Sequence, residues 1–387
     1  MASPFQRYSR ATIVAGATAA GLLIIGASGT AFALTGTFSP APTQAAASGN
    51  AEGAPRWTVT KQTPAQQAVV KAAVGASAAA ALPTYAYVAV AGGGEVLKVD
   101  IATGTFVASY SDDTGEGVAL TPSGATAYIA STGQYDVLAT NTTTGAKTTI
   151  EVGAYPQDVA VSPDGSTVYA TVTGGDTGPG GSNQVAVIST ATNAVTGDIT
   201  VGNAPRQVVF SPNGSRAYVT TSAGIYVIDT ATSRVVRVIR DSDDPQGIAV
   251  SPDGSTLYVT NPDANTLWQV NAASGRVEGV TNAGQQPYSV TITPSGSAVY
   301  VADENSNSVD VISTATGRVT GTIAVQGLPQ SIAATPDGSQ VWVGNGYTGS
   351  ISVISTATNT VVDTISGGGQ ATALNSAITD IAFGPAS

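Results

Sequence analysis

The stretch SPDGSTLYVTN, residues 251–261, decides the fold. Its Pro-Asp-Gly segment favours a tight turn, because proline presets φ and glycine tolerates a positive φ. The β-branched and aromatic residues that follow, Leu257 to Thr260, favour a strand. One turn and one strand do not specify an architecture, so the argument depends on how often this stretch recurs.

The same turn recurs along the chain at a nearly constant period. Its prolines are spaced 41, 49, 40, 42 and 42 residues apart: Pro122, Pro163, Pro212, Pro252, Pro294 and Pro336. An aromatic residue stands six positions after each proline: Tyr128, Tyr169, Tyr218, Tyr258, Tyr300 and Trp342. A fixed period in this range indicates a repeat architecture.

Each repeat contains four short strand patterns separated by polar turns. In the repeat from Pro245, we expect strands over 247–250, 257–260, 266–270 and 276–280. Four strands per repeat of this length are typical of a propeller blade, which must stack on neighbours to bury both faces. The sequence therefore predicts an all-β propeller over residues 85–387.

The blade count depends on the two ends of this region. The first repeat lacks its innermost strand, because Tyr85–Val90 already carries the pattern of a second strand. The missing strand and its turn proline recur at the C-terminus, in residues 378–385. We predict seven four-stranded blades, with the C-terminal strand completing the N-terminal blade (85–110), and insertions at 173–183 and 367–376.

The region before residue 85 has the order of an export signal. Arg7 and Arg10 precede an uncharged stretch, and Ala31-Phe32-Ala33 supplies a small-residue cleavage site, so residues 1–34 are predicted to be a signal peptide. The alternative is that this segment is not cleaved and anchors the chain in a membrane, which is the only membrane contact we expect. Residues 35–84 form an Ala/Pro/Ser-rich linker with a possible short helix from Thr63 to about Ala80. A secreted or cell-surface location follows.

Composition excludes several classes of function. The chain has no His and no Cys, which removes His-based catalytic triads, thiol nucleophiles, zinc fingers and iron–sulfur clusters. Its net charge is −11, with only 14 Lys and Arg residues, so nucleic acid is not an expected partner. We expect a monomer that contacts a protein or a cell-envelope polymer.

The strand after the turn carries a resemblance to a known family. Residues 257–261, with Tyr-Val-Thr at 218–220 and Tyr-Val-Ala-Asp at 300–303, resemble the YVTN β-propeller repeat family. That resemblance implies the propeller fold. The family includes exported and surface-layer proteins. The fold is also similar to that of propeller lactonases, including 6-phosphogluconolactonase, and to quinoprotein dehydrogenase subunits. Propeller lactonases tend to use His, which this chain lacks.

One position in each repeat is predicted to surround the mouth of the central channel. It lies six residues before the turn proline, where the innermost strand begins: Glu116, Gln157, Arg206, Gln246, Tyr288, Gln330 and Thr379. Glutamine is the commonest residue there, so Glu116, Arg206 and Tyr288 are the first candidates for ligand binding. Polar residues also occur at channel mouths merely because water fills them.

The loops on the same face hold many acidic residues, Asp158 among them. The candidates for holding a divalent cation are Asp241, Asp243, Asp244, Asp263, Asp303 and Glu304. Clustered carboxylates suit a hard cation such as Ca²⁺, the one cofactor the sequence leaves open, although a solvated acidic rim gives the same pattern. The spacing lacks that of an EF-hand.

Three functions fit these observations. The favoured one is an exported, non-catalytic propeller that acts as a binding scaffold. The alternative is a lactonase-like hydrolase with a carboxylate base, Arg206 as oxyanion donor and a bound divalent cation. The second alternative is a quinoprotein-type redox subunit. It needs Trp near the cofactor, whereas Trp268 and Trp342 fall on strand positions typical of the core between blades.

Overall fold

The computed structural model describes residues 22–25, 31–34, 84–91, 95–111, 115–174, 183–240, 244–366 and 377–384. The chain divides after Ala79 into two units. In the first, β1 (Leu22–Ile25) pairs antiparallel with β2 (Ala31–Leu34). No helix among the described residues is long and apolar enough to cross a membrane. The predicted helix from Thr63 and both predicted insertions lie largely or wholly outside the described residues.

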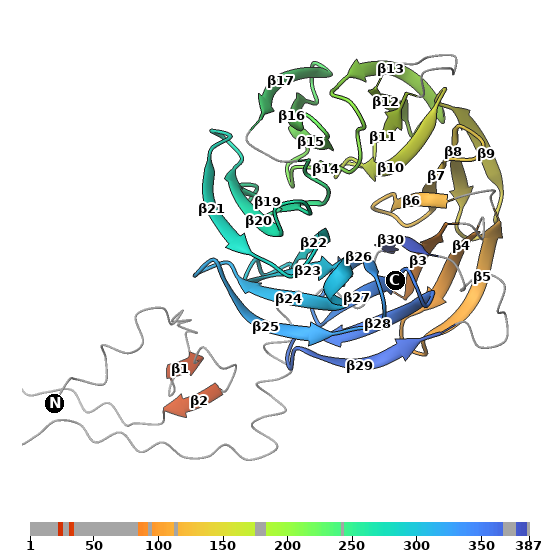
Figure 1. Cartoon of the computed structure of the whole chain (residues 1–387). Helices are drawn as coiled ribbons and strands as arrows, with labels where there is room; N and C mark the ends of the chain where they lie inside the picture. The colour runs from red at the N-terminus through yellow and green to blue at the C-terminus, as the bar shows by residue number, and fades with distance from the viewer. Residues whose placement is uncertain are drawn as a thin grey trace, which may run out of the picture. The chain divides into compact units, whose positions relative to one another are not determined.

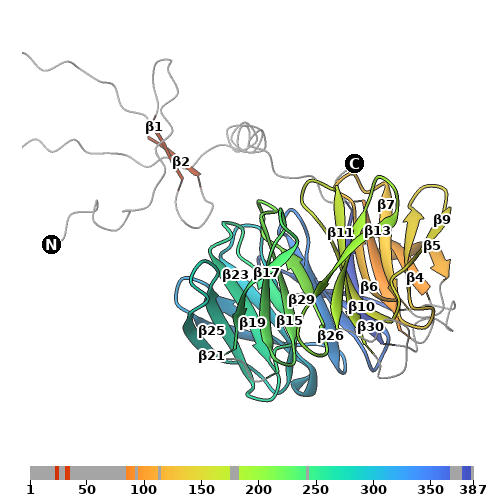
Figure 2. The ribbon, with the colours of Figure 1, turned by 90° about the horizontal axis from the view of Figure 1, so that it is seen from above.

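The second unit is the predicted ring of seven four-stranded antiparallel sheets (Figures 1 and 2). Blade 1 is completed from both ends of this unit and consists of β30 (Ile378–Phe383), β3 (Tyr85–Val90), β4 (Glu95–Asp100) and β5 (Thr105–Ser111). Blade 2 consists of β6 (Gly115–Leu120), β7 (Thr126–Ser131), β8 (Asp136–Asn141) and β9 (Lys147–Glu151). Blade 3 consists of β10 (Tyr155–Val161), β11 (Thr167–Thr173), β12 (Gln184–Ser189) and β13 (Ala194–Thr200).

The remaining four blades repeat the same order without interruption. Blade 4 consists of β14 (Val208–Phe210), β15 (Arg216–Thr221), β16 (Gly224–Asp229) and β17 (Arg234–Ile239). Blade 5 consists of β18 (Ile248–Val250), β19 (Thr256–Asn261), β20 (Thr266–Asn271) and β21 (Val277–Asn282). Blade 6 consists of β22 (Pro287–Ile292), β23 (Ala298–Asp303), β24 (Ser308–Ser313) and β25 (Arg318–Ala324), with a 3₁₀ turn, η2 (Glu304–Ser306). Blade 7 consists of β26 (Pro329–Ala334), β27 (Gln340–Asn345), β28 (Ser350–Ser355) and β29 (Thr360–Ile365).

The predicted closure of the ring is confirmed. β30 pairs antiparallel with β3, so that Val88 lies opposite Ile381 and Ala86 opposite Phe383. Ile378 is fully buried, and the rings of Phe383 and of Trp342 in blade 7 form a T-shaped pair with centroids 5.5 Å apart. The C-terminal strand therefore joins the first and last blades through one apolar cluster.

The periodic aromatic residues pack between neighbouring blades. Tyr128 is 1% exposed, yet its hydroxyl donates a 2.7 Å hydrogen bond to Asn193 in the next blade. Tyr300 does the same with Asn359 at 2.6 Å. A buried phenol needs such a partner for its hydroxyl, so the repeated Tyr supplies apolar contact and a polar link between blades together.

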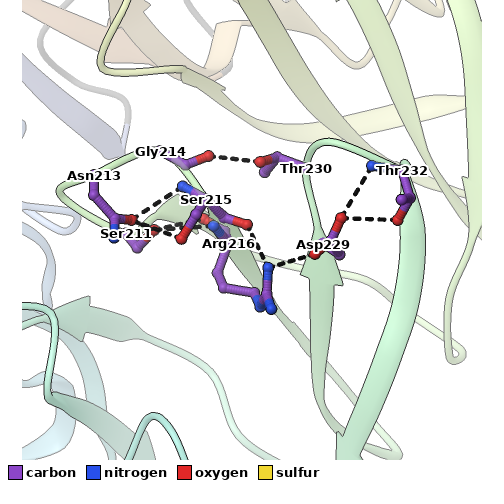
Figure 3. A network of polar contacts seen from close by, with 8 residues as sticks. All are labelled: Ser211, Asn213, Gly214, Ser215, Arg216, Asp229, Thr230 and Thr232. Carbon is purple, nitrogen blue, oxygen red and sulfur yellow. Dashed lines mark hydrogen bonds and ion pairs between the residues drawn. The ribbon is translucent and has the colours of Figure 1, made fainter.

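The Pro-x-Gly turns are built by short-range hydrogen bonds, as Figure 3 shows for blade 4. The Ser211 hydroxyl and the backbone N–H of Ser215 both donate to the side-chain oxygen of Asn213. Gly214 has φ +69°, a conformation that glycine adopts with little strain. The Thr230 hydroxyl donates to the Gly214 carbonyl at 2.6 Å, which ties this turn to the next one. The turns thus serve structure, as their regularity predicts.

Candidate functional site at the channel mouth

The innermost strands bring all seven predicted mouth residues to one cavity. It has a volume of about 410 Å³, and Glu116, Gln157, Arg206, Gln246, Tyr288, Gln330 and Thr379 all line it. Each of them is partly exposed, as expected of side chains that face a water-filled opening. The predicted position is therefore confirmed, whereas a binding role for these residues stays a prediction.

Threonines of the preceding blade hold several mouth residues by their backbone. The Thr171 hydroxyl donates to the carbonyl of Arg206 at 2.7 Å. Thr220 donates in the same way to Gln246 at 2.8 Å, and Thr260 to Tyr288 at 3.0 Å. Each donor is the residue two positions after the periodic tyrosine. A threonine two positions after the periodic tyrosine thus fixes the start of the innermost strand in the following blade.

The residue directly after the mouth position adds a second link, which the repeat pattern did not predict. Asp380 accepts a 2.8 Å hydrogen bond from the backbone N–H of Val118 in the next blade. Asp158 accepts one from Val208, also at 2.8 Å, and Gln207 accepts one from Ile248 at 2.7 Å. These three side chains line the cavity as well. They bind backbone N–H groups that a three-residue or interrupted strand would leave unpaired.

Two of these three residues, Asp380 and Asp158, carry carboxyl groups whose pKa is changed by burial. Burial raises the pKa of Asp380 to about 6. Burial also raises the pKa of Asp158 well above its usual range, and the charge of Asp380 raises it further. Gly117 in blade 2 faces blade 3, and a Cβ on it would come within 2.8 Å of the Asp158 Cα. The close approach of the blades here explains the glycine.

Glu116, Arg206 and Tyr288 differ in how far their polar groups are already engaged. The Arg206 guanidinium forms a 2.8 Å ion pair with Asp244 and also donates to the Pro245 carbonyl at 3.0 Å. Burial raises the pKa of Glu116. Burial likewise raises the pKa of Tyr288, as do the nearby charges of Glu304 and Glu116. Arg206 is thus held by its own rim, yet its charge acts on Tyr288 as well and lowers the pKa of that hydroxyl in part. The Tyr288 hydroxyl also hydrogen-bonds the Gln246 side chain and lies near enough to the Glu116 carboxyl to feel its charge.

Comparison with known proteins places the chain in a family. Residues 106–331 match the family described as "Lactonase, 7-bladed beta-propeller". The chain belongs to this lactonase family. No curated protein sequence matches it.

Two solved structures share the fold of this lactonase-family propeller. Hydrazine synthase from Kuenenia stuttgartiensis is similar with a TM-score of 0.62 and 22% sequence identity, covering 68% of this chain and 90% of the other. A functionally unknown protein from Desulfotomaculum acetoxidans DSM 771 is similar with a TM-score of 0.66 and 14% identity, covering 79% of this chain and all of the other. At these identities the likeness shows the fold alone.

The acidic residues predicted to hold a cation have different surroundings in this lactonase-family propeller. Asp241 and Asp243 lie outside the described residues. Asp244 pairs with Arg206, Asp263 is exposed, and Glu304 accepts a 2.7 Å hydrogen bond from Gln330. Asp303 lies at the end of β23 and is fully buried, not part of a solvated rim. The described residues contain no group of three acidic side chains that could hold a metal ion, and the cation site stays a prediction.

The two tryptophans within the described residues sit in the strands. Trp342 is 1% exposed and packs in the apolar cluster of blade 7, and Trp268 packs against the cluster between blades 4 and 5. Neither lines the mouth cavity. These two residues thus do not assemble the arrangement that a quinone cofactor needs, and a quinoprotein-type function stays a prediction.

Proposed function

We propose that this lactonase-family propeller is an exported binding protein that captures a small, uncharged, hydroxyl-rich ligand at its channel mouth without converting it. The observation that carries the proposal is the amide-rich lining of the 410 Å³ cavity: Gln157, Gln207, Gln246 and Gln330. A glutamine side chain both donates and accepts hydrogen bonds, as a ligand hydroxyl does. The volume lies in the range of small-molecule sites.

The charged groups of the mouth support a neutral ligand. Arg206, which lines the cavity, has its charge matched by Asp244. The carboxyl groups of Asp158 and Asp380 line the cavity, so a negatively charged ligand would be repelled wherever these groups are ionised. A cation would have to compete with the backbone N–H groups that both carboxyls already bind. A polyol or sugar meets neither obstacle.

Export remains part of the proposal. The basic start, uncharged stretch and Ala-Phe-Ala site of residues 1–34 support a cleaved signal, and the YVTN-like repeats agree with a place at the cell surface. The mass of the chain recovered from the culture medium or cell envelope reports cleavage directly. A full-length mass with an intact N-terminus would instead support the anchor.

Titration calorimetry with a panel of neutral mono- and disaccharides tests the binding proposal. We expect at least one sugar to bind, and Gln246→Ala to weaken it about tenfold, because a hydrogen bond inside a binding site contributes on the order of 1–1.5 kcal/mol. Tyr288→Phe removes one hydroxyl from the cavity, and Tyr347→Phe is its matched control outside it. If no sugar binds, or if Tyr347→Phe weakens binding as much as Tyr288→Phe, the proposal is wrong.

Lactone hydrolysis is the second candidate, favoured by the family and by the Glu116–Tyr288 neighbourhood. Glu116 would take a proton from an attacking water, and the Tyr288 hydroxyl would donate to the carbonyl oxygen as it gains charge. The ring C–O bond then breaks, and Glu116 returns the proton to the leaving alkoxide. Proton release from glucono-δ-lactone, γ-butyrolactone and an acyl homoserine lactone measures this. A loss of activity of at least a hundredfold in Glu116→Gln would establish hydrolysis. A wild-type chain that hydrolyses none of the lactones would rule hydrolysis out and leave ligand binding as the function.

A further inference from the structure

An exposed pair of tyrosines lies beside the channel mouth. Tyr135 is in the loop between β7 and β8, and Tyr155 is the first residue of β10. Their ring centroids are 4.9 Å apart with planes at 89°, and the side chains are 43% and 41% exposed. Their hydroxyls are 3.4 Å apart. Large aromatic side chains are normally buried, so two exposed rings packed on each other need an explanation.

The residue type at Tyr135 departs from the repeat, although its backbone conformation follows the repeat. It has φ +65°, directly before the first residue of its blade's third strand. The same position is Asn265 in blade 5, Asn307 in blade 6 and Gly349 in blade 7, with φ of +54°, +54° and +58°. Asn and Gly adopt this left-handed conformation with little strain, whereas an aromatic residue rarely does. An Asn or Gly, as in blades 5 to 7, would avoid this strain. A strained tyrosine in their place points to a role in function.

Tyr155 departs from the repeat in backbone conformation, because it begins the strand β10 whereas its counterparts in blades 4 to 7 have φ between +47° and +59°. It lies two residues before the mouth residue Gln157, where blades 4 to 7 have Ala204, Asp244, Gln286 and Leu328. Two hydrogen bonds tie its loop to that of Tyr135: Gly153 N–H donates to the Tyr135 carbonyl at 3.3 Å, and Thr132 donates to the Pro156 carbonyl at 2.8 Å. The two departures therefore meet at the junction of blades 2 and 3, next to the mouth.

We propose that Tyr135 and Tyr155 form a subsite for one sugar ring of a neutral glycan chain whose neighbouring unit occupies the mouth. This rests on the proposed function and extends it from a small sugar to an oligosaccharide. The C–H face of a sugar ring packs on an aromatic face, and the phenol hydroxyls hydrogen-bond its hydroxyl groups. Tyrosine gives this contact at low conformational cost because it has few rotatable bonds. The net charge of −11 disfavours an anionic polymer.

The test compares hexasaccharides with monosaccharides on the full-length mature protein. The probes are chitohexaose, cellohexaose and maltohexaose, each against its own monosaccharide. We expect a hexasaccharide to bind about tenfold more tightly than its monosaccharide, a gain of about 1.4 kcal/mol by the affinity relation. Tyr135→Asn should remove that gain and leave monosaccharide affinity unchanged. The same variant should melt at an equal or higher temperature, because it restores the residue of blades 5 and 6 and relieves the strain.

The control is Tyr347→Asn, which removes an isolated tyrosine that is 76% exposed in the β27–β28 loop. Unchanged hexasaccharide affinity in Tyr347→Asn supports the subsite, and an equal loss in both variants overturns it as a general effect of exposed aromatic residues. If monosaccharides bind but Tyr135→Asn leaves the hexasaccharide gain intact, the subsite is wrong and the proposed function stands. If no saccharide of any length binds, both fail.

Discussion

Removal of residues 377–387 is expected to abolish the stable ring. The deletion takes away β30, and with it the buried Ile378 and Ile381 and the Phe383 ring that packs on Trp342. At about 2 kcal/mol for each of these three apolar side chains, the lost burial is on the order of 6 kcal/mol. That is comparable with the whole stability of many domains, about 5–15 kcal/mol.

The deletion also removes polar links that no other residue replaces. Asp380 no longer accepts from the Val118 N–H, and Ser331 in blade 7 loses the Ile378 carbonyl to which its hydroxyl donates at 3.1 Å. The apolar edge of β3 becomes an open sheet edge, which favours aggregation. The truncated chain should elute in aggregates from a sizing column and lack a cooperative thermal transition.

A peptide supplied in trans separates loss of closure from general misfolding. The peptide 377–387 should restore a cooperative transition to the truncated chain, because the propeller closes by pairing rather than by chain continuity. The same peptide with Ile378→Asp and Ile381→Asp is the control and should restore nothing. A truncated chain that melts at the wild-type temperature without any peptide would contradict the role given to β30.

The fold was predictable because each blade repeats its own local signals. The turn prolines and the aromatic residues six positions later define the period, and the period defines where each innermost strand begins. The same argument located Glu116, Gln246 and the other mouth residues, since equivalent positions of a repeat lie at equivalent places around the axis. Even the composite blade followed from matching residues 378–385 to a strand that the first repeat lacks.

The hydrogen bonds between neighbouring blades could not be predicted from the sequence. Asp380, Asp158 and Gln207 act on backbone groups of the next blade, and a period within one repeat says nothing about such contacts. One signal was available, because Thr171, Thr220 and Thr260 recur at one position and could have been read as partners of the following strand. The unusual residue at Tyr135 was also visible, because blades 5, 6 and 7 have Asn265, Asn307 and Gly349 at its position.

Replacing Asp303 by Asn is expected to stabilise the propeller at neutral pH. Asp303 ends β23 and is fully buried, and the equivalent residues of blades 5 and 7 are Asn261 and Asn345, also fully buried. No hydrogen bond of ordinary geometry reaches either carboxyl oxygen of Asp303. Burial, and then the nearby charge of Asp310, raise its pKa from 3.8 to about 8, and neighbouring backbone N–H groups offset this only in part.

The sign of the effect follows from the two pKa values. The unfolded chain loses the Asp303 proton near pH 4, whereas the folded chain keeps it to about pH 8. Because the folded state binds the extra proton, stability from this group is lost as pH rises from about 4 to 8. Asn cannot ionise, so the variant and the wild type should match near pH 4. At pH 7 the variant should be more stable by roughly 4 kcal/mol, at 1.36 kcal/mol per pH unit over about three units.

Chemical denaturation at several pH values between 4 and 8 measures this difference. Asp253→Asn is the control of opposite sign, because hydrogen bonds from Ser251 and Ser255 lower the pKa of Asp253 to about 2. That carboxylate stabilises the fold above about pH 4 and loses its effect as pH falls toward 2, so its replacement should destabilise at neutral pH. If Asp303→Asn lowers stability at pH 7 as Asp253→Asn does, the buried carboxyl is held as an ion by a partner such as a bound cation, and the prediction is wrong.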